Sequence, residues 1–161
     1  MLAVKLFLAL ILGSAALHKG MERDRLAGVT ARLARIGVQE GRFLLLTAAL
    51  VEGLAALALL VPGLAQGGAI AATLLWSLYA IALWRQRGQR MDCGCDFTRR
   101  EKPIGTAQIA RPALLAALAL AVALLPEGSW SAEAPFAALG FAALWFAAGE
   151  LLSLPHFARA R

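Results

Sequence analysis

Five long apolar stretches, separated by short polar segments, constrain the fold more than any other feature of the sequence. They are residues 2–17, 43–62, 67–84, 104–125 and 135–154. A helix of about 20 apolar residues crosses the roughly 30 Å of hydrocarbon in a bilayer. Hydrophobic residues make up 60% of the chain, and the prevailing Leu and Ala favour helices over strands. The sequence therefore predicts an all-α, polytopic membrane bundle, with about five spans around a four-helix core, in a single domain over residues 1–161.

The first apolar stretch has two interpretations. Lys5 near its start and the small residues Gly13-Ser14-Ala15-Ala16 near its end are also typical of a cleaved signal peptide. Because no soluble domain follows this stretch, we expect it to be retained as a membrane helix.

Residues 21–38 differ from the apolar stretches because arginines alternate with apolar side chains. Leu26, Val29, Leu33 and Ile36 recur at helical spacing, which predicts an amphipathic helix. Such a helix either lies along the bilayer surface, with its arginines at anionic lipid head groups, or packs against its own bundle. The sequence leaves both alternatives open.

The basic residues are distributed unevenly between the predicted loops. The chain has 16 Lys and Arg and a formal net charge of +6. All of them except Lys5 fall in the first loop, the third loop with its flanks, or the C-terminal tail. The positive-inside rule places these segments in the cytoplasm. A distribution that follows the loops also argues against nucleic acid as a partner.

The two cysteines of the chain, Cys93 and Cys95, lie one residue apart in the third loop. Gly94 permits the bend that would bring their Cα atoms within the approximately 6.8 Å that a disulfide requires. A ring this small removes little entropy from the unfolded chain, so the bond would contribute little stability. A strained, easily reduced bond suits reversible thiol–disulfide exchange, which is the function that we favour for the pair.

Two other interpretations of the pair remain open. Two thiolates can bind Cu(I) or another thiophilic ion, in a metal-binding or transport protein. Structural zinc normally requires four ligands, and only His18 and His156 could supplement the cysteines. In the third interpretation, the pair has no chemical role.

Charged residues within the predicted spans are further candidates for the functional site. Glu52 lies near the middle of the second span, where a carboxyl group either accepts a proton during thiol chemistry or joins helices. Arg111 lies near the start of the fourth span, and we expect it to be drawn partly into the bundle, where it would stabilise a thiolate. We expect Glu150 to pair with Arg111 or Lys19. Small residues expected to permit close helix contacts are Gly13, Ser14, Gly53, Gly140 and Gly149.

The segment Arg87-Gly88-Gln89-Arg90-Met91-Asp92-Cys93-Gly94-Cys95, followed by an arginine at the next span, resembles the methylamine-utilisation MauE family, which belongs with the DoxX-like redox-associated membrane proteins. His18-Lys19 and Glu52 also occupy positions where such proteins carry a lysine and a glutamate. The chain departs from the family pattern in having Asp96-Phe97 after the cysteines and Pro112 after the arginine.

The resemblance implies a membrane protein that acts with a thioredoxin-like partner. Its expected role is disulfide formation, or maturation, of an exported protein, which in this family is the small subunit of methylamine dehydrogenase. The expected location is the bacterial inner membrane. Family function places the cysteine loop on the periplasmic side, whereas the charge distribution places it in the cytoplasm.

A single cysteine pair must pass its electrons directly to a cofactor or to the thiols of a second protein. A quinone would suit the first route, although no residue pattern identifies a quinone site. The sequence leaves open whether the chain is itself a thiol–disulfide oxidoreductase and whether it forms a homo-oligomer.

Overall fold

The computed structural model describes residues 1–91, 102–126 and 131–153. Cys93, Cys95 and His156 lie outside these residues. The described helices are α1 (Leu2–Met21), α2 (Arg23–Ala34), α3 (Val38–Leu60), α4 (Ala65–Arg85), α5 (Thr106–Leu124) and α6 (Ala134–Ser153). Two short strands, β1 (Arg90–Met91) and β2 (Lys102–Pro103), pair in an antiparallel ladder.

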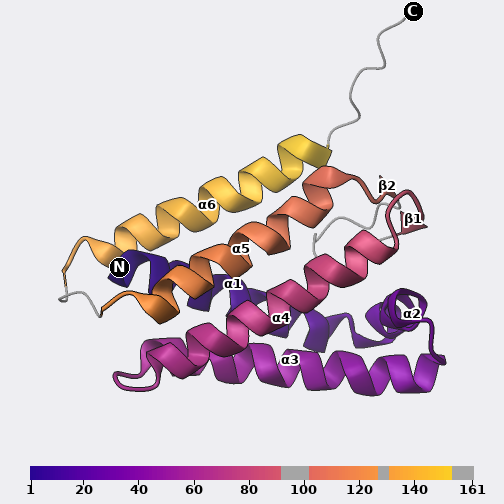
Figure 1. The fold of residues 1–161 in the computed structure, drawn as a ribbon, viewed down its shortest axis with the longest axis horizontal. Coiled ribbons are helices and arrows are strands. Elements are labelled where there is room, and N and C mark those ends of the chain that lie inside the picture. The colour runs from indigo at the N-terminus through magenta and orange to yellow at the C-terminus, as the bar shows by residue number, and fades with distance from the viewer. Residues whose placement is uncertain (92–101, 127–130, 154–161) are drawn as a thin grey trace, which may run out of the picture.

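The five long helices run in alternating directions along the long axis of the molecule, which is horizontal in Figure 1. Helices α3, α4, α5 and α6 lie in sequence order across the view, and α1 packs against α3, α5 and α6. All five are long and apolar enough to cross a membrane, and one core of buried side chains is shared among them. The predicted all-α, polytopic bundle is therefore confirmed.

Several helices extend beyond the apolar stretches from which they were predicted. Helix α1 continues to Met21 rather than ending at residue 17, and α3 begins at Val38 rather than at residue 43. The first turns of α3 include Glu40 and Arg42, which are exposed. Hydropathy marks the part of a helix suited to hydrocarbon, whereas backbone hydrogen bonding continues into polar sequence at either end.

Helix α2 is shorter than the predicted amphipathic segment and lies across one end of the bundle, where Figure 1 shows it almost end on. Leu26 and Ala27 pack with Leu45 of α3 in a small buried cluster. A Cβ atom added to Gly41 of α3 would lie 2.7 Å from the carbonyl oxygen of Ala27. The apolar side of α2 thus packs against its own bundle, the second of the two alternatives.

Most of the glycines expected to permit close helix contacts do not lie at such contacts, whereas other glycines do. A Cβ added to Gly68 of α4 would lie 2.9 Å from the carbonyl oxygen of Ala55 on α3. A Cβ added to Gly13, Gly53 or Gly140 would meet no heavy atom within 4 Å, so the expectation for these residues was wrong. The sequence shows that a residue is small but not which side of its helix faces a neighbour.

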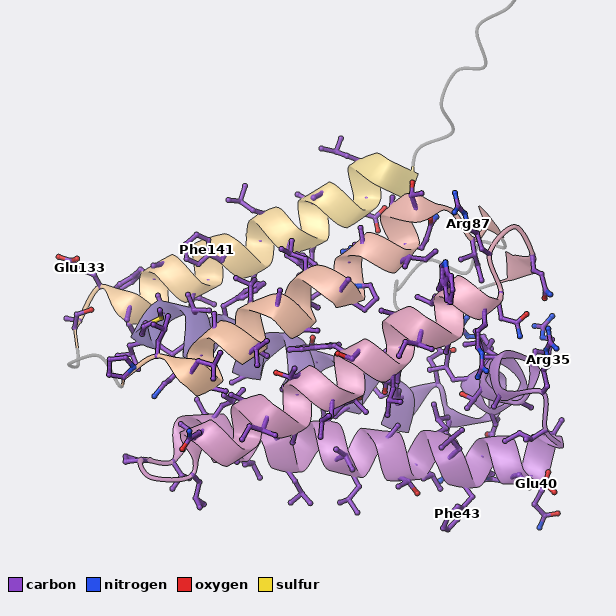
Figure 2. All side chains as sticks on the ribbon, in the orientation of Figure 1. Arg35, Glu40, Phe43, Arg87, Glu133 and Phe141 are labelled. Atoms are coloured by element: carbon purple, nitrogen blue, oxygen red, sulfur yellow. The ribbon has the colours of Figure 1, made fainter. Side chains whose placement is uncertain are left out.

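The arginines of α2, of the first turns of α3, of the end of α4 and of the adjoining turns gather at one end of the bundle, which we call the basic end. Figure 2 shows Arg35 and Arg87 at this end and Glu133 at the opposite end. Helices α1 and α4 end here, and α3 and α5 begin here. The basic end comprises Arg23, Arg25, Arg32, Arg35, Arg42, Arg85 and Arg87.

Candidate functional site

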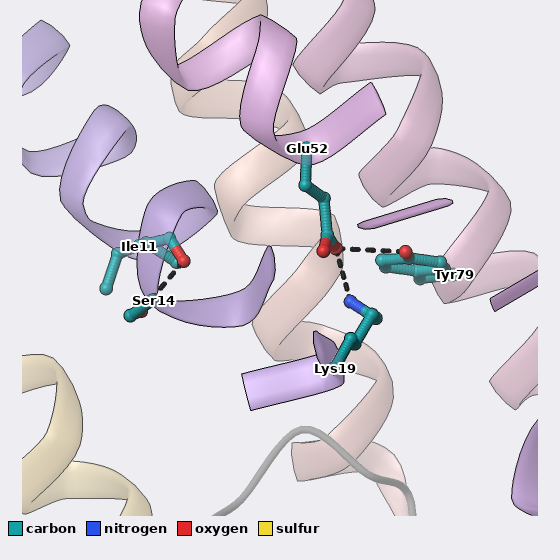
Figure 3. Close-up of polar contacts among 5 residues, drawn as sticks. All are labelled: Ile11, Ser14, Lys19, Glu52 and Tyr79. Carbon is teal, nitrogen blue, oxygen red and sulfur yellow. Dashed lines mark hydrogen bonds and ion pairs between the residues drawn. The ribbon is translucent and has the colours of Figure 1, made fainter. Parts of the chain in front are cut away.

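Three polar side chains from different helices meet inside the bundle, and we call them the Glu52 cluster. Lys19 from α1 places its Nζ atom 2.5 Å from Oε1 of Glu52, which lies on α3. Tyr79 from α4 donates its hydroxyl hydrogen to the same oxygen at 2.9 Å. Figure 3 shows the three side chains converging. The cluster therefore links three of the membrane-spanning helices through a single carboxylate oxygen.

The direction of each helix explains how Lys19 reaches a partner so far inside the bundle. Side chains on a helix lean toward its N-terminus. Lys19 lies in the last turn of α1, so its side chain leans away from the basic end and into the bundle. Glu52 lies on the antiparallel α3, so its side chain leans back toward the basic end. The two groups consequently approach each other across the interface between α1 and α3.

The two carboxylate oxygens of Glu52 have different environments. The side chain is fully buried, with 0% of its surface exposed, whereas Lys19 retains 16% exposure. Oε1 receives both hydrogen bonds, and Oε2 has no hydrogen-bond partner among the described residues. The Nζ atom of Lys19 also lies 5.1 Å from the ring centroid of Tyr79, within cation–π range. Within the described residues, Oε1 thus accepts two hydrogen bonds, and Oε2 is available to accept one from a further donor.

Arg111 occupies a second polar site, between α5 and α6. Its Nη2 atom donates a hydrogen bond to the carbonyl oxygen of Trp145 at 3.2 Å, and the guanidinium carbon lies 4.9 Å from the Trp145 ring centroid. A Cβ added to Gly149 would lie 2.7 Å from the guanidinium group, so glycine leaves the room that the arginine occupies. Arg111 lies more than one turn inside α5 and is partly buried, as expected.

The ladder between β1 and β2 closes the base of the segment that contains the cysteines. Arg90 pairs with Pro103 and Met91 pairs with Lys102. The backbone N–H of Ile104 donates to Gln89, and that of Gly88 donates to Ile104, both at 3.0 Å. Ile104 packs with Leu83 in a buried cluster. These contacts join the described residues on either side of the cysteine segment to each other at the basic end of the bundle.

Comparisons with known proteins agree with this architecture. The family model described as "Methylamine utilisation protein MauE" matches residues 1–125. The chain belongs to the MauE family. The methylamine utilization protein MauE of Paracoccus denitrificans is 34% identical over 125 residues, covering 75% of this chain and 67% of that relative. No solved structure matches the chain. The family match ends at the C-terminal boundary of α5, so α6 lies beyond the part that defines MauE membership.

The structure brings together some of the predicted site residues in this MauE-family chain and separates others. Lys19 pairs with Glu52, so of the two cations expected as partners of Glu150, Arg111 or Lys19, Lys19 is engaged elsewhere. Arg111 contacts α6 through Trp145, whereas Glu52 contacts α1 and α4. These contacts of Glu52 and Arg111 thus involve different helices. The predicted cysteine pair lies outside the described residues.

Tyr79 is the functional candidate that sequence reasoning missed. It is the only tyrosine in the chain and lies well inside a span, whereas membrane tyrosines are enriched at the water interfaces. Its position away from an interface could have indicated a buried hydrogen bond. The sequence could not indicate that Glu52 would be its partner, because that depends on how α3 and α4 are rotated relative to each other.

Proposed function

We propose that this MauE-family protein is a membrane thiol–disulfide factor in which Cys93 and Cys95 exchange electrons with a thioredoxin-like protein. The exchange supports disulfide formation in an exported protein, and the family relationship points to methylamine metabolism as its setting. In this proposal Arg111 stabilises a cysteine thiolate and Glu52 accepts a proton. The proposed location is the bacterial inner membrane.

The observation that carries this proposal is the ladder that closes the base of the cysteine segment. Cys93 and Cys95 follow Met91 of β1 by two and four residues in the sequence, and in this proposal both thiols react at the end of the bundle where the ladder lies. The start of α5 follows β2 after two residues and places Arg111 at this same end. Positive charge near a thiol favours the thiolate, which is the reactive form.

The exchange balances with a partner dithiol as the reductant. A partner thiolate attacks one sulfur of the Cys93–Cys95 disulfide, which forms a mixed disulfide and releases the other cysteine as a thiolate. The second partner thiolate then attacks the mixed disulfide, leaving an oxidised partner and two reduced cysteines. The two protons of the partner thiols pass to the cysteine sulfurs. Reoxidation of the cysteine pair passes the two electrons on to a second protein disulfide or to a quinone.

Trapping of the mixed disulfide tests this function. In either single variant, Cys93→Ser or Cys95→Ser, the remaining thiolate can attack the disulfide of an oxidised thioredoxin-like protein, which is the reverse of the exchange above. The missing cysteine removes the second attack of this reverse exchange, so a reductant-sensitive adduct between the two proteins should accumulate. The double serine variant is the matched control and should form no adduct. Full disulfide formation in the exported protein by the double variant would refute the proposal. Stoichiometric thiophilic metal in the reduced protein, lost in the double variant, would instead support a metal-binding function.

The side of the membrane on which the thiols react is part of the proposal and has its own test. The concentration of arginines at the basic end supports a cytoplasmic location for the cysteines. In intact cells, a membrane-impermeant thiol reagent should then leave Cys93 and Cys95 unmodified, whereas a permeant reagent should modify both. Labelling by the impermeant reagent would place the exchange in the periplasm, where a partner for an exported protein is also available.

A further inference from the structure

Oε2 of Glu52 accepts no hydrogen bond from the described residues, and its ion-pair partner Lys19 is partly exposed. These two observations point to a role of the Glu52 cluster that is separate from thiol chemistry. We infer that the Glu52 cluster is a single-proton switch in which Oε2 of Glu52 accepts the proton and Lys19 is the group that moves in response. The inference rests on the proton-accepting role proposed above for Glu52, but it does not depend on thiol exchange.

Geometry identifies Oε2 as the accepting atom. Oε1 already receives hydrogen bonds from Lys19 and Tyr79, whereas Oε2 has none among the described residues. A fully buried carboxylate oxygen is costly to keep charged when no described side chain donates a hydrogen bond to it. A proton on Oε2 removes the negative charge while leaving both hydrogen bonds to Oε1 geometrically available. Lys19 and Tyr79 are therefore positioning residues that leave one defined oxygen open.

Charge balance identifies Lys19 as the moving group. With Glu52 ionised, the pair is neutral, and a neutral pair inside a bundle has a lower free-energy cost than one unpaired charge. Protonation of Glu52 would leave the ammonium of Lys19 without its counter-charge. Lys19 lies in the last turn of α1, retains 16% exposure, and has a flexible side chain that can turn toward the basic end and water. Glu52, with 0% exposure, does not have this freedom.

Among the described residues, the ionisable side chains that contact Glu52 are those of Lys19 and Tyr79. Glu52 faces Lys19 on α1 and Tyr79 on α4, and His18 precedes Lys19 on α1. The charged residues of α2 and the end of α4 belong to the basic end. Among the described contacts, Lys19 is the cation that neutralises Glu52. A change of charge on the carboxyl group therefore removes the ion-pair partner of Lys19.

Lysine reactivity provides a direct measurement. The purified full-length protein in nanodiscs is treated with an amine-acylating reagent at fixed pH, and the extent of modification is measured at each lysine by mass spectrometry. Lys5 and Lys102 are the other lysines and serve as internal references. Replacing Glu52 by Gln, which mimics the protonated acid, should raise the modification rate of Lys19 relative to Lys5 about tenfold, the effect expected for loss of one charge-assisted hydrogen bond. Glu40→Gln, at the exposed start of the same helix, is the matched control and should not change the ratio.

A second measurement observes the proton itself and does not require a variant that folds. Infrared spectra of protein labelled with ¹³C-glutamate, recorded as the pH is lowered, should show a buried carboxylate band replaced by a protonated carboxyl band that exchanges slowly with deuterium. Tyr79→Phe should shift the frequency of that band because it removes a hydrogen bond to Oε1. The switch is refuted if no buried carboxyl band appears before the protein unfolds, or if Glu52→Gln folds and leaves the Lys19 ratio unchanged. Neither result bears on mixed-disulfide trapping, so the two proposals fail separately.

Discussion

The Glu52 cluster and the Arg111 site show two ways in which a helical bundle accommodates charge. Glu52 is fully buried and depends on Lys19 and Tyr79, each from a different helix. Arg111 is partly exposed and contacts a backbone carbonyl and an aromatic ring, both of Trp145. The fully buried carboxylate thus draws its contacts from two other helices, whereas these two contacts of the partly exposed guanidinium group come from a single residue.

The two sites also differ in which helices they join. The Glu52 cluster joins α1, α3 and α4, all of which fall within the family match. Arg111 joins α5 to α6, which lies beyond it. Helix α6 packs on α1 through Phe7, whose ring centroid lies 6.2 Å from that of Phe141 and 6.1 Å from that of Trp145. We therefore expect disruption of the Glu52 cluster to destabilise the whole bundle, and disruption of the Arg111 site to affect mainly the attachment of α6.

The largest expected effect comes from removing one member of the Lys19–Glu52 pair. Lys19→Met leaves a buried carboxylate without its cation, and we expect a loss of about 3–5 kcal/mol in the free energy of unfolding. In the Lys19→Met/Glu52→Gln double variant, both charges are absent, so much of this loss should be recovered. The measurement is a double-mutant cycle from unfolding titrations in mixed micelles. Additive effects of the two substitutions would show that the pair is not coupled and that the stability of buried Glu52 does not depend on Lys19.

An intermediate effect is expected at the contact between Arg111 and Gly149. Gly149→Val places a side chain where the guanidinium group lies, and overpacking of this kind costs about 1–3 kcal/mol. Gly140→Val is the matched control on the same helix, because a Cβ there meets no heavy atom within 4 Å. Protease sensitivity of α6 in nanodiscs should rise for Gly149→Val and remain unchanged for Gly140→Val. Equal sensitivity of the two variants would show that Arg111 does not hold α6.

The sequence predicted much of the fold but only part of each site. Five apolar stretches were sufficient to predict the spans, because hydropathy depends on composition alone. The midplane position of Glu52 was sufficient to predict that it faces the interior with a partner. The identity of that partner was not predictable, because Lys19 is 33 residues away and the pairing depends on how α1 leans across α3. The glycine contacts failed for the same reason, since helix rotation decides whether Gly68 or Gly53 faces a neighbour.

The smallest expected effect tests whether Arg111 acts through its charge or through its shape. Arg111→Lys retains the positive charge but loses the planar group that lies over the Trp145 ring and bonds its carbonyl oxygen. We expect a loss of about 0.5–1 kcal/mol in the free energy of unfolding, the range for a cation–π contact at an exposed site. Arg87→Lys, at an exposed position of the basic end, should leave the unfolding titration unchanged. A loss at Arg111→Lys as large as that at Lys19→Met would show that the partly exposed Arg111 site is as sensitive to side-chain geometry as the fully buried Lys19–Glu52 pair. The difference proposed between the two sites would then not hold.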